Sequence, residues 1–281
     1  MSTDVTSHRD DPAMTITIAR SERRQSLWAQ TAAMSSRSIT AFLRQPALVV
    51  PSLVFPLFFA ALGTSSFSQA IDLPGFPPVQ SFLDFALAGT IIQGVLFGSI
   101  TGATALATDI DNGFFDRLLT TPTSRSSILI GRLAGAMAFG GVQTIIFIAV
   151  LLPFGLRIQS GVLGAAVMVL GGVLTALAVG ALLSIMALRT GSPEAVQGSF
   201  PLLFVLLFFS SAFFPRQTMT GVYRRLADAN PISYLVEAFR DLTIEALSLG
   251  AVVRLMVISG LAALVTVTMA LRALNRRLVK P

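Results

Sequence analysis

The residues that most enzymes use for chemistry are scarce in this chain. Among its 281 residues there is no cysteine, the one histidine is His8, and the one lysine is Lys280. Cysteine nucleophiles and thiolate metal sites are therefore excluded. His8 lies in a polar tail, so zinc sites and Ser-His-Asp triads, which need a histidine beside their partners, are not expected. A phosphate-binding loop needs a lysine after its glycine-rich turn, so the chain is not expected to bind ATP in that way. We expect neither a catalytic residue nor a metal in this chain.

Charged residues gather instead in a short segment between two apolar runs. Residues 109–125 read DIDNGFFDRLLTTPTSR, with three Asp, two Arg, a Gly and a Pro. Spacing predicts that four apolar residues share one face of a short helix, namely Phe114, Phe115, Leu118 and Leu119. Asp116 and Arg117 fall on other faces of that helix, and Pro122 ends it. The pattern predicts an amphipathic helix at a membrane surface. That helix either contacts a partner protein or only connects two spans.

Two further groups could contact a ligand. A short helix after Tyr234 carries the charged residues Glu237, Arg240, Asp241 and Glu245. They could gate the exit of a ligand, or simply solvate the end of the helix. Phe200, Phe204 and Phe208 recur at i, i+4 and i+8, which predicts an aromatic stripe. That stripe either faces an amphiphilic ligand or packs against other helices.

Composition places these groups in a membrane protein. The chain is 53% hydrophobic and 12% charged, whereas soluble domains carry about 25% charged residues. Six apolar runs are each able to supply one crossing: residues 45–71, 85–108, 133–156, 158–188, 195–215 and 255–271. The predicted fold is an all-α polytopic membrane protein with six transmembrane helices. A polar tail precedes them, and an amphipathic interfacial helix is expected from residue 27 to about residue 44.

The basic residues predict the orientation. With both termini in the cytoplasm, the inside segments hold 14 Lys and Arg residues and the outside segments hold five. In this topology residues 109–125 face the cytoplasm, and residues 216–245 form an external segment that partly re-enters the membrane. We assign residues 1–26 to a disordered cytoplasmic tail, 27–273 to the membrane domain and 274–281 to a basic cytoplasmic tail. The positive charge is explained by this topology, so nucleic-acid binding is not expected.

Two blocks of sequence resemble a known family. DNGFFDRLLTTPTSRSSILIGRLAG resembles the cytoplasmic loop of ABC type-2 permeases, in the drug-export branch that includes the daunorubicin-resistance permeases. The matching residues are Asp111, Gly113, Phe115, Asp116, Arg117, Leu118, Pro122, Ser124, Arg125, Gly131 and Arg132. Residues 193–215 together with NPISYLVEAFR (230–240) resemble the fifth span and external re-entrant segment of that family. A weaker match is FLRQP at 42–46, and the likeness extends to about residue 271.

The resemblance implies the permease subunit of an ATP-driven exporter that moves an amphiphilic drug, lipid or small natural product out of the cell by alternating access. Such a permease lies in the cell membrane, dimerises with an identical or a sister chain, and sits on two separate ATPase subunits. ATP and magnesium would be bound by those subunits. The resemblance assigns ATPase coupling to Asp111, Gly113, Phe114, Phe115, Asp116, Arg117, Leu118, Pro122 and Arg125. The apolar face would press into a groove on the ATPase, or stay in the interface while Asp116 and Arg117 meet the ATPase.

The remaining candidates are an external re-entrant segment or gate, and two residues that could face the substrate. The first set is Asn230, Pro231, Tyr234, Glu237 and Arg240, and the second is Phe204 and Phe208. An ion-driven transporter is an alternative, but it would place charged residues inside its spans, where five of the six runs have none. A lipid-modifying enzyme would need clustered carboxylates or histidines, for which Asp109, Asp111 and Asp116 are the only candidates. A membrane anchor or assembly protein also remains open.

Overall fold

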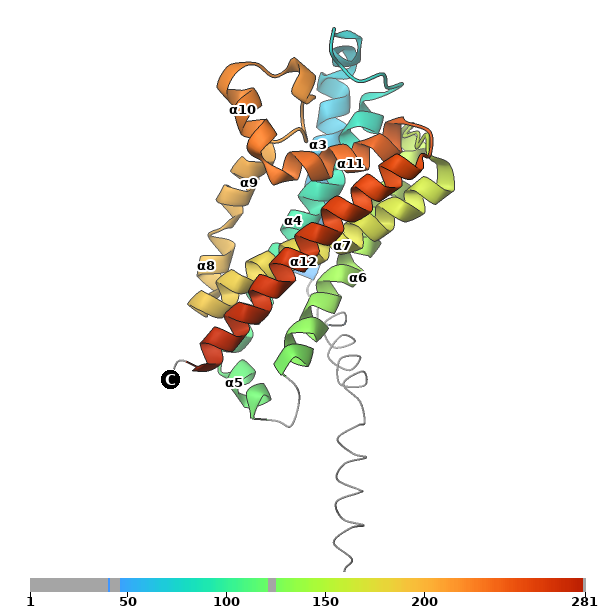
Figure 1. The fold of residues 1–281 in the computed structure, drawn as a ribbon. Helices are drawn as coiled ribbons and strands as arrows, with labels where there is room; N and C mark the ends of the chain where they lie inside the picture. The colour runs from blue at the N-terminus through green and yellow to red at the C-terminus, as the bar shows by residue number, and fades with distance from the viewer. Residues whose placement is uncertain (1–39, 41–45, 121–124, 280–281) are drawn as a thin grey trace, which may run out of the picture.

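Long apolar helices make up most of the structure. The computed structural model describes residue 40, residues 46–120 and residues 125–279, and the regular structure in these ranges is entirely helical (Figure 1). Five helices are long and apolar enough to cross a membrane: α3 (Pro46–Ser66), α4 (Phe82–Asp111), α6 (Arg125–Leu151), α7 (Gly161–Thr190) and α12 (Leu249–Val279). The all-α membrane fold is therefore confirmed. The interfacial helix and the N-terminal tail predicted for residues 1–44 lie outside the described residues, apart from Thr40.

Shorter elements connect the long helices. They are α5 (Phe114–Leu119), α8 (Pro193–Gln197), α9 (Phe200–Phe208), α10 (Gly221–Ala229), α11 (Pro231–Ile244) and 3-10 turns at Ser68–Asp72, Leu152–Phe154 and Arg216–Thr218. Figure 1 shows α5 beside the C-terminal end of α12, and α10 and α11 at the opposite end. We call these the α5 end and the α11 end. The two segments predicted on opposite sides of the membrane thus lie at opposite ends.

The fifth apolar run differs from the prediction of one continuous span. Helix α8 stops at Gln197, α9 begins at Phe200, and the chain leaves helical geometry after Phe208. Pro201 lies in the first turn of α9, where its missing N–H removes no helical bond, so the chain restarts a helix here instead of continuing one. Sixteen residues of helix would rise only about 24 Å, less than the roughly 30 Å of a hydrocarbon core. Five spans are confirmed as long helices, and the sixth crossing stays a prediction.

Helix α4 forms the centre of the bundle. Its most apolar 18-residue window is entirely buried, whereas 17% of the corresponding window of α3 and 22% of that of α12 are buried. Helices α3, α6, α7 and α11 all pack against it. Small residues allow α6 and α7 to approach each other closely. A Cβ added to Gly140 of α6 would lie 2.9 Å from the carbonyl oxygen of Gly172 in α7. The outer faces of α3 and α12 are left for lipid or for another chain.

A buried amide fastens α3 to α6. Pro56 has no N–H, so the carbonyl of Ser52, four residues earlier, cannot receive its usual helical hydrogen bond. The Gln143 side chain, which is fully buried, donates from Nε2 to this carbonyl oxygen at 2.8 Å. Where water is absent, an unpaired carbonyl is costly, so this contact stabilises the proline-containing helix against its neighbour.

We predict that Gln143→Met lowers stability by about 1–3 kcal/mol, because it leaves the Ser52 carbonyl buried and unpaired. In a Pro56→Ala background the new N–H of residue 56 can pair with that carbonyl, so the same change should cost clearly less. Thermal unfolding of the four purified proteins in detergent measures both losses. Equal losses in the two backgrounds would show that Gln143 does not act through this carbonyl.

Candidate functional site

Helix α5 follows α4 after a tight two-residue turn. Gly113 has a φ of 69° and its N–H donates to the carbonyl of Ile110 at 3.1 Å, which closes the end of α4. No atom lies within 4 Å of a Cβ added there, so the left-handed backbone alone favours glycine. The side-chain oxygen of Asn112 accepts from the N–H of Phe114 at 3.0 Å and starts α5. The sequence Asn-Gly therefore reverses the chain between the two helices.

The structure divides α5 into an anchored face and an exposed face. Phe115 is only 1% exposed and belongs to the core of this chain, and Leu118 packs against the same core. Asp116 and Arg117 are exposed. Phe115 therefore cannot insert into a groove on another protein in this conformation. Phe115 packs inside its own chain, and so differs also from the second predicted arrangement, in which the apolar face stays in the membrane interface. The contact of Asp116 and Arg117 with an ATPase stays a prediction.

The remaining residues of the predicted ATPase-coupling site lie at the ends of helices or outside the described residues. Asp111 is exposed and ends α4, and Phe114 is partly buried at the start of α5. Pro122 lies outside the described residues. The backbone of Arg125 begins α6, but its side chain is not described.

The ends of the long helices are tied together next to α5. Arg132 of α6 forms an ion pair with Asp109 of α4, and both side chains are largely shielded from solvent. Arg277 in the last turn of α12 donates to the carbonyl oxygen of Leu188 near the end of α7 at 2.9 Å. Gly191, which ends α7, lies beside Ile110 of α4. Helices α4, α6, α7 and α12 are thus joined at the α5 end.

At the α11 end, Asn230 connects the start of α11 to the end of α9. Its side-chain oxygen accepts from the N–H of Ile232 at 2.9 Å, so it caps α11. Its amide nitrogen donates to the carbonyl oxygens of Leu206 at 2.6 Å and Phe209 at 3.0 Å. Carbonyls in the last turn of a helix have no helical partner, and Asn230 supplies one. Pro231 follows in the first turn of α11, where its missing N–H is not needed.

Arg240 is an internal residue, although its charge suggested a solvated position. It is 4% exposed, and its guanidinium lies 3.8 Å from the ring centroid of Phe85 in α4. One of its nitrogens donates to the carbonyl oxygen of Ser211 at 2.7 Å and to that of Ala212 at 3.4 Å. Arg240 therefore does not solvate the end of α11. It holds α11 and the residues after α9 against α4.

The exposed side of α11 carries an ion-pair network. Glu237 accepts two hydrogen bonds from Arg216, and Arg254 of α12 lies 3.7 Å from it. Arg254 also pairs with Asp241 at 2.7 Å. The Arg216 guanidinium lies 4.8 Å from the ring centroid of Tyr234, and its pairing with Glu237 raises its pKa above the ordinary value. Glu237 is thus paired with Arg216 and Arg254.

Asp84 is a connecting residue that the sequence analysis missed. Its buried carboxylate accepts from the backbone N–H of Ser81 at 3.1 Å and from that of Arg157 at 2.8 Å. The first contact belongs to a capping box that begins α4. The Ser-x-x-Asp spacing before an apolar run was the available signal. The second contact, to a residue between α6 and α7, has no local sequence pattern.

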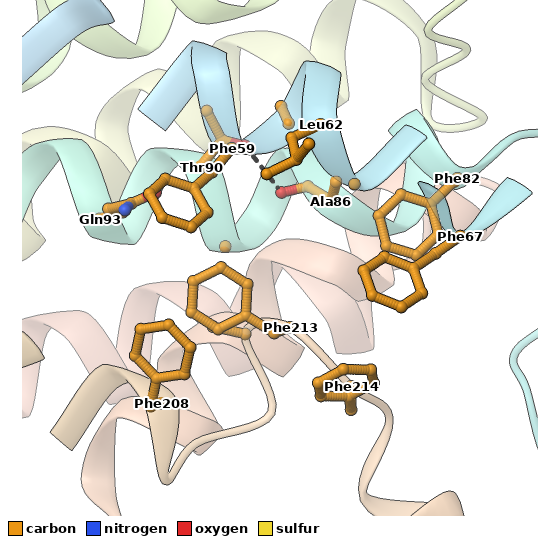
Figure 2. A pocket seen from close by; sticks show the side chains of 14 residues that line it. Phe59, Leu62, Phe67, Phe82, Ala86, Thr90, Gln93, Phe208, Phe213 and Phe214 are labelled. Carbon is orange, nitrogen blue, oxygen red and sulfur yellow. Dashed lines mark hydrogen bonds between the residues drawn. The ribbon is translucent and has the colours of Figure 1, made fainter. Parts of the chain in front are cut away.

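The predicted aromatic residues lie between two cavities. A cavity of about 200 Å³ at the α11 end is lined by Phe208 and other residues of α3, α4 and the chain after α9 (Figure 2). A cavity of about 530 Å³ lies between Pro51, Phe97, Gln197 and their neighbours. The Phe204 ring lines neither cavity. Its centroid lies 4.8 Å from the ring centroid of Phe208 and 6.3 Å from that of Phe97. Phe208 faces a cavity, whereas Phe204 packs among the rings that separate the two.

The family of this chain follows from its sequence and agrees with this geometry. The profile of the ABC-2 type transporter family matches residues 29–244, which is most of the chain. The chain belongs to the ABC-2 type transporter family. It is 31% identical, over 73% of its own length and 72% of the relative's, to the daunorubicin resistance ABC transporter permease protein DrrB1 of Streptomyces coeruleorubidus.

Two further relatives are more distant. The probable doxorubicin resistance ABC transporter permease protein DrrC of Mycobacterium tuberculosis H37Rv is 25% identical, over 75% of this chain and 76% of that one. The inner membrane transport permease YadH of Escherichia coli K12 is 28% identical, over 76% and 82%. This ABC-2 permease is therefore an integral membrane transport protein of a class that is normally non-catalytic and works with an ATPase partner. Among the described residues of the permease, no three His, Cys, Asp or Glu side chains form a group that could hold a metal ion.

We predict that Arg240→Met destabilises the permease by about 1–3 kcal/mol, because the Ser211 and Ala212 carbonyls lose their donor in a buried place. Arg240→Lys should recover part of the loss. Thermal unfolding in detergent measures the effect. The matched control is Arg225→Met, which removes an exposed arginine from the neighbouring helix and should shift stability by less than about 0.5 kcal/mol. Similar shifts for Arg240 and Arg225 would refute the anchoring role.

Proposed function

We propose that this chain is the translocating subunit of an ATP-driven exporter that moves an amphiphilic drug, lipid or small natural product out of the cell. Membership of the ABC-2 family supports transport, and the names of two relatives as daunorubicin and doxorubicin resistance permeases support this class of cargo. Two permease chains, identical or sister, would enclose the cargo path and alternate between inward-open and outward-open states. Two separate ATPase subunits would bind ATP and magnesium. This permease would lie in the cell membrane with both termini in the cytoplasm.

The observation that carries the coupling part of this proposal is the two-sided character of α5. Its buried Phe115 fixes the helix to the core, while Asp116 and Arg117 are exposed at the end of the bundle. A rigidly anchored helix with exposed charges transmits force from a partner without changing its own shape. We assign the ATPase contact to Asp116 and Arg117, and a positioning role to Phe115 and Gly113.

The charges of the spans weigh against an ion-driven mechanism. In the five long helices, acidic residues occur only in α4, where Asp84 lies in the first turn and Asp109 and Asp111 lie in the last. Ion-coupled carriers place such groups in the middle of the membrane. Asp84 is occupied by two backbone N–H groups, and Asp109 by Arg132.

We predict that reversing the exposed charges, with Asp116→Lys and Arg117→Glu together, disrupts coupling and leaves the permease folded. The chain is co-expressed with candidate ATPase subunits and purified through a tag on the permease, and the ATPase retained and its hydrolysis rate are measured. Reversal of interface charges should weaken retention by roughly tenfold, which corresponds to about 1.4 kcal/mol.

Two controls make this result specific. Arg225→Glu reverses an exposed charge of α10, at the opposite end of the molecule, and should leave ATPase retention unchanged. Phe115→Ala should lower the thermal stability of the permease, since it empties a fully buried position. If the charge reversal retains the ATPase and its activity like the wild type, α5 is a connecting helix and the coupling assignment is wrong.

A further inference from the structure

Helix α10 exposes apolar side chains although most of its residues are polar or small. Val222 is 70% exposed and Leu226 is 44% exposed, and the two residues lie four apart on one face of the helix. Ala229 extends the same face and is also exposed. We call these three residues the α10 stripe. In an amphipathic helix such a stripe normally faces apolar surroundings.

A second face of α10 packs on its own chain. Ala227 is buried, and the Tyr223 hydroxyl donates to the carbonyl oxygen of Phe208 at the end of α9. The Tyr223 ring centroid lies 5.5 Å from that of Phe209. These contacts fix the rotation of α10 about its axis, so the α10 stripe points away from α9.

A third face of α10 carries charge. Arg224 and Asp228 form an ion pair at 3.8 Å, and Asp228 also pairs with Arg216 at 3.3 Å. With 3.6 residues per turn, the order around the helix is the packed face, the ion-paired face, Arg225 and then the α10 stripe. The helix therefore presents a water-facing side and an apolar side, with an arginine at the boundary between them.

The position of α10 agrees with the surface of a membrane. Figure 1 shows it next to the end of α9, at the α11 end of the bundle. Leu202 and Val205 of α9 are strongly exposed, as expected for a helix in apolar surroundings. The ion-paired face of α10 needs water and the α10 stripe needs to avoid it. Both needs are met together where hydrocarbon and water adjoin.

Lipid fits the α10 stripe better than a protein partner does. A stable protein interface takes about 800 Å² from each partner, whereas the stripe is one valine, one leucine and one alanine on a nine-residue helix. Arg225 is exposed and forms no ion pair with the described residues. Lipid phosphates lie at the level of this boundary residue, so a phospholipid layer complements both the stripe and the adjacent positive charge.

We propose that α10 lies in the headgroup region of the membrane, with Val222 and Leu226 among the acyl chains of the phospholipid leaflet at the α11 end. Arg224 and Asp228 then remain in water. Because Tyr223 holds α10 to the end of α9, this lipid contact fixes the depth of the chain that follows α9. Neither an ATPase nor a transported compound takes part in the contact, so it is independent of the proposed function.

The absence of cysteine from the chain allows a site-specific test, because one introduced cysteine is then the only thiol. Val222→Cys, Leu226→Cys and Arg224→Cys are made in the full-length chain, labelled with a nitroxide and reconstituted into vesicles of phosphatidylcholine and phosphatidylglycerol. Electron paramagnetic resonance measures the collisions of each label with oxygen, which concentrates in lipid, and with a nickel chelate, which stays in water. The oxygen-to-nickel ratio should be roughly fivefold higher at positions 222 and 226 than at 224, since the apolar face of an interfacial helix is buried about 5–10 Å.

A label at Leu264→Cys, on the exposed face of α12, supplies the reference for lipid. Two results would overturn the proposal. Nickel collisions at positions 222 and 226 as frequent as those at 224 would place the α10 stripe in water. Few collisions with either reagent would show that protein covers the stripe, and broadening of the spectrum by a neighbouring label would identify that protein as a second copy of the chain.

A measurement on the wild type guards against variants that fail to fold. The unmodified chain is reconstituted with a phospholipid that carries a photoreactive diazirine near the top of its acyl chain and is irradiated, and the labelled residues are identified by mass spectrometry. Trypsin cleaves after Arg216, Arg224 and Arg225, so Val222 and Leu226 fall on separate peptides. Lipid adducts at both residues support the contact. Their absence from both, with adducts present on α12, refutes it.

Discussion

Inside a membrane no water is available for backbone N–H and C=O groups, so every departure from regular helix has to be compensated by the protein. Side chains compensate three such departures in the described part of the chain, at Pro56 in α3, at the end of α9 and in the turn after it. In each place a side chain from another helix donates to the freed carbonyls: Gln143 to Ser52 at 2.8 Å, Asn230 to Leu206 at 2.6 Å, and Arg240 to Ser211 at 2.7 Å. This requirement accounts for the three interior donors Gln143, Asn230 and Arg240.

The compensated segments are also the ones that line the cavities. Helix α3 contributes Phe59 to the smaller cavity and Pro51 to the larger, and the broken α8–α9 segment contributes Phe208 and Gln197. Helices α6, α7 and α12 are continuous; α6 and α7 pack on each other and on α4, and α12 packs on α7. The molecule thus consists of a frame of continuous helices, with the interrupted α3 and α8–α9 segments on one side of it. Helical interruptions are where backbone angles change at least cost, so the walls of the cavities can move while the frame keeps its shape.

The length of the apolar runs predicted the five long helices, and apolar spacing predicted α5, because hydrophobic length and spacing are local properties of the sequence. The break in the fifth run was missed, since residues 195–215 are uniformly free of charge and Pro201 alone did not distinguish a restarted helix from a bent one. Arg240 was predicted either to gate the exit of a ligand or to solvate the end of its helix, because charge normally indicates exposure. Its burial depends on carbonyls 28 and 29 residues away in sequence, and no local pattern contains them. Phe115 shows the same limit: its spacing predicted the correct face but could not say whether that face packs inward or on a partner.

Helix α4 connects α5 with the smaller cavity. It is one uninterrupted helix from Phe82 to Asp111, and the short turn at Asn112 and Gly113 joins it to α5. Gln93 lies 18 residues before Asp111, or roughly 27 Å along the axis at 1.5 Å per residue. Phe115 packs in the core at one end of this helix, and the residues of α4 that line the smaller cavity lie toward its other end. Since α4 is enclosed by its neighbours, a change in its position requires them to move as well. Helix α5 and the smaller cavity are therefore joined through one continuous helix.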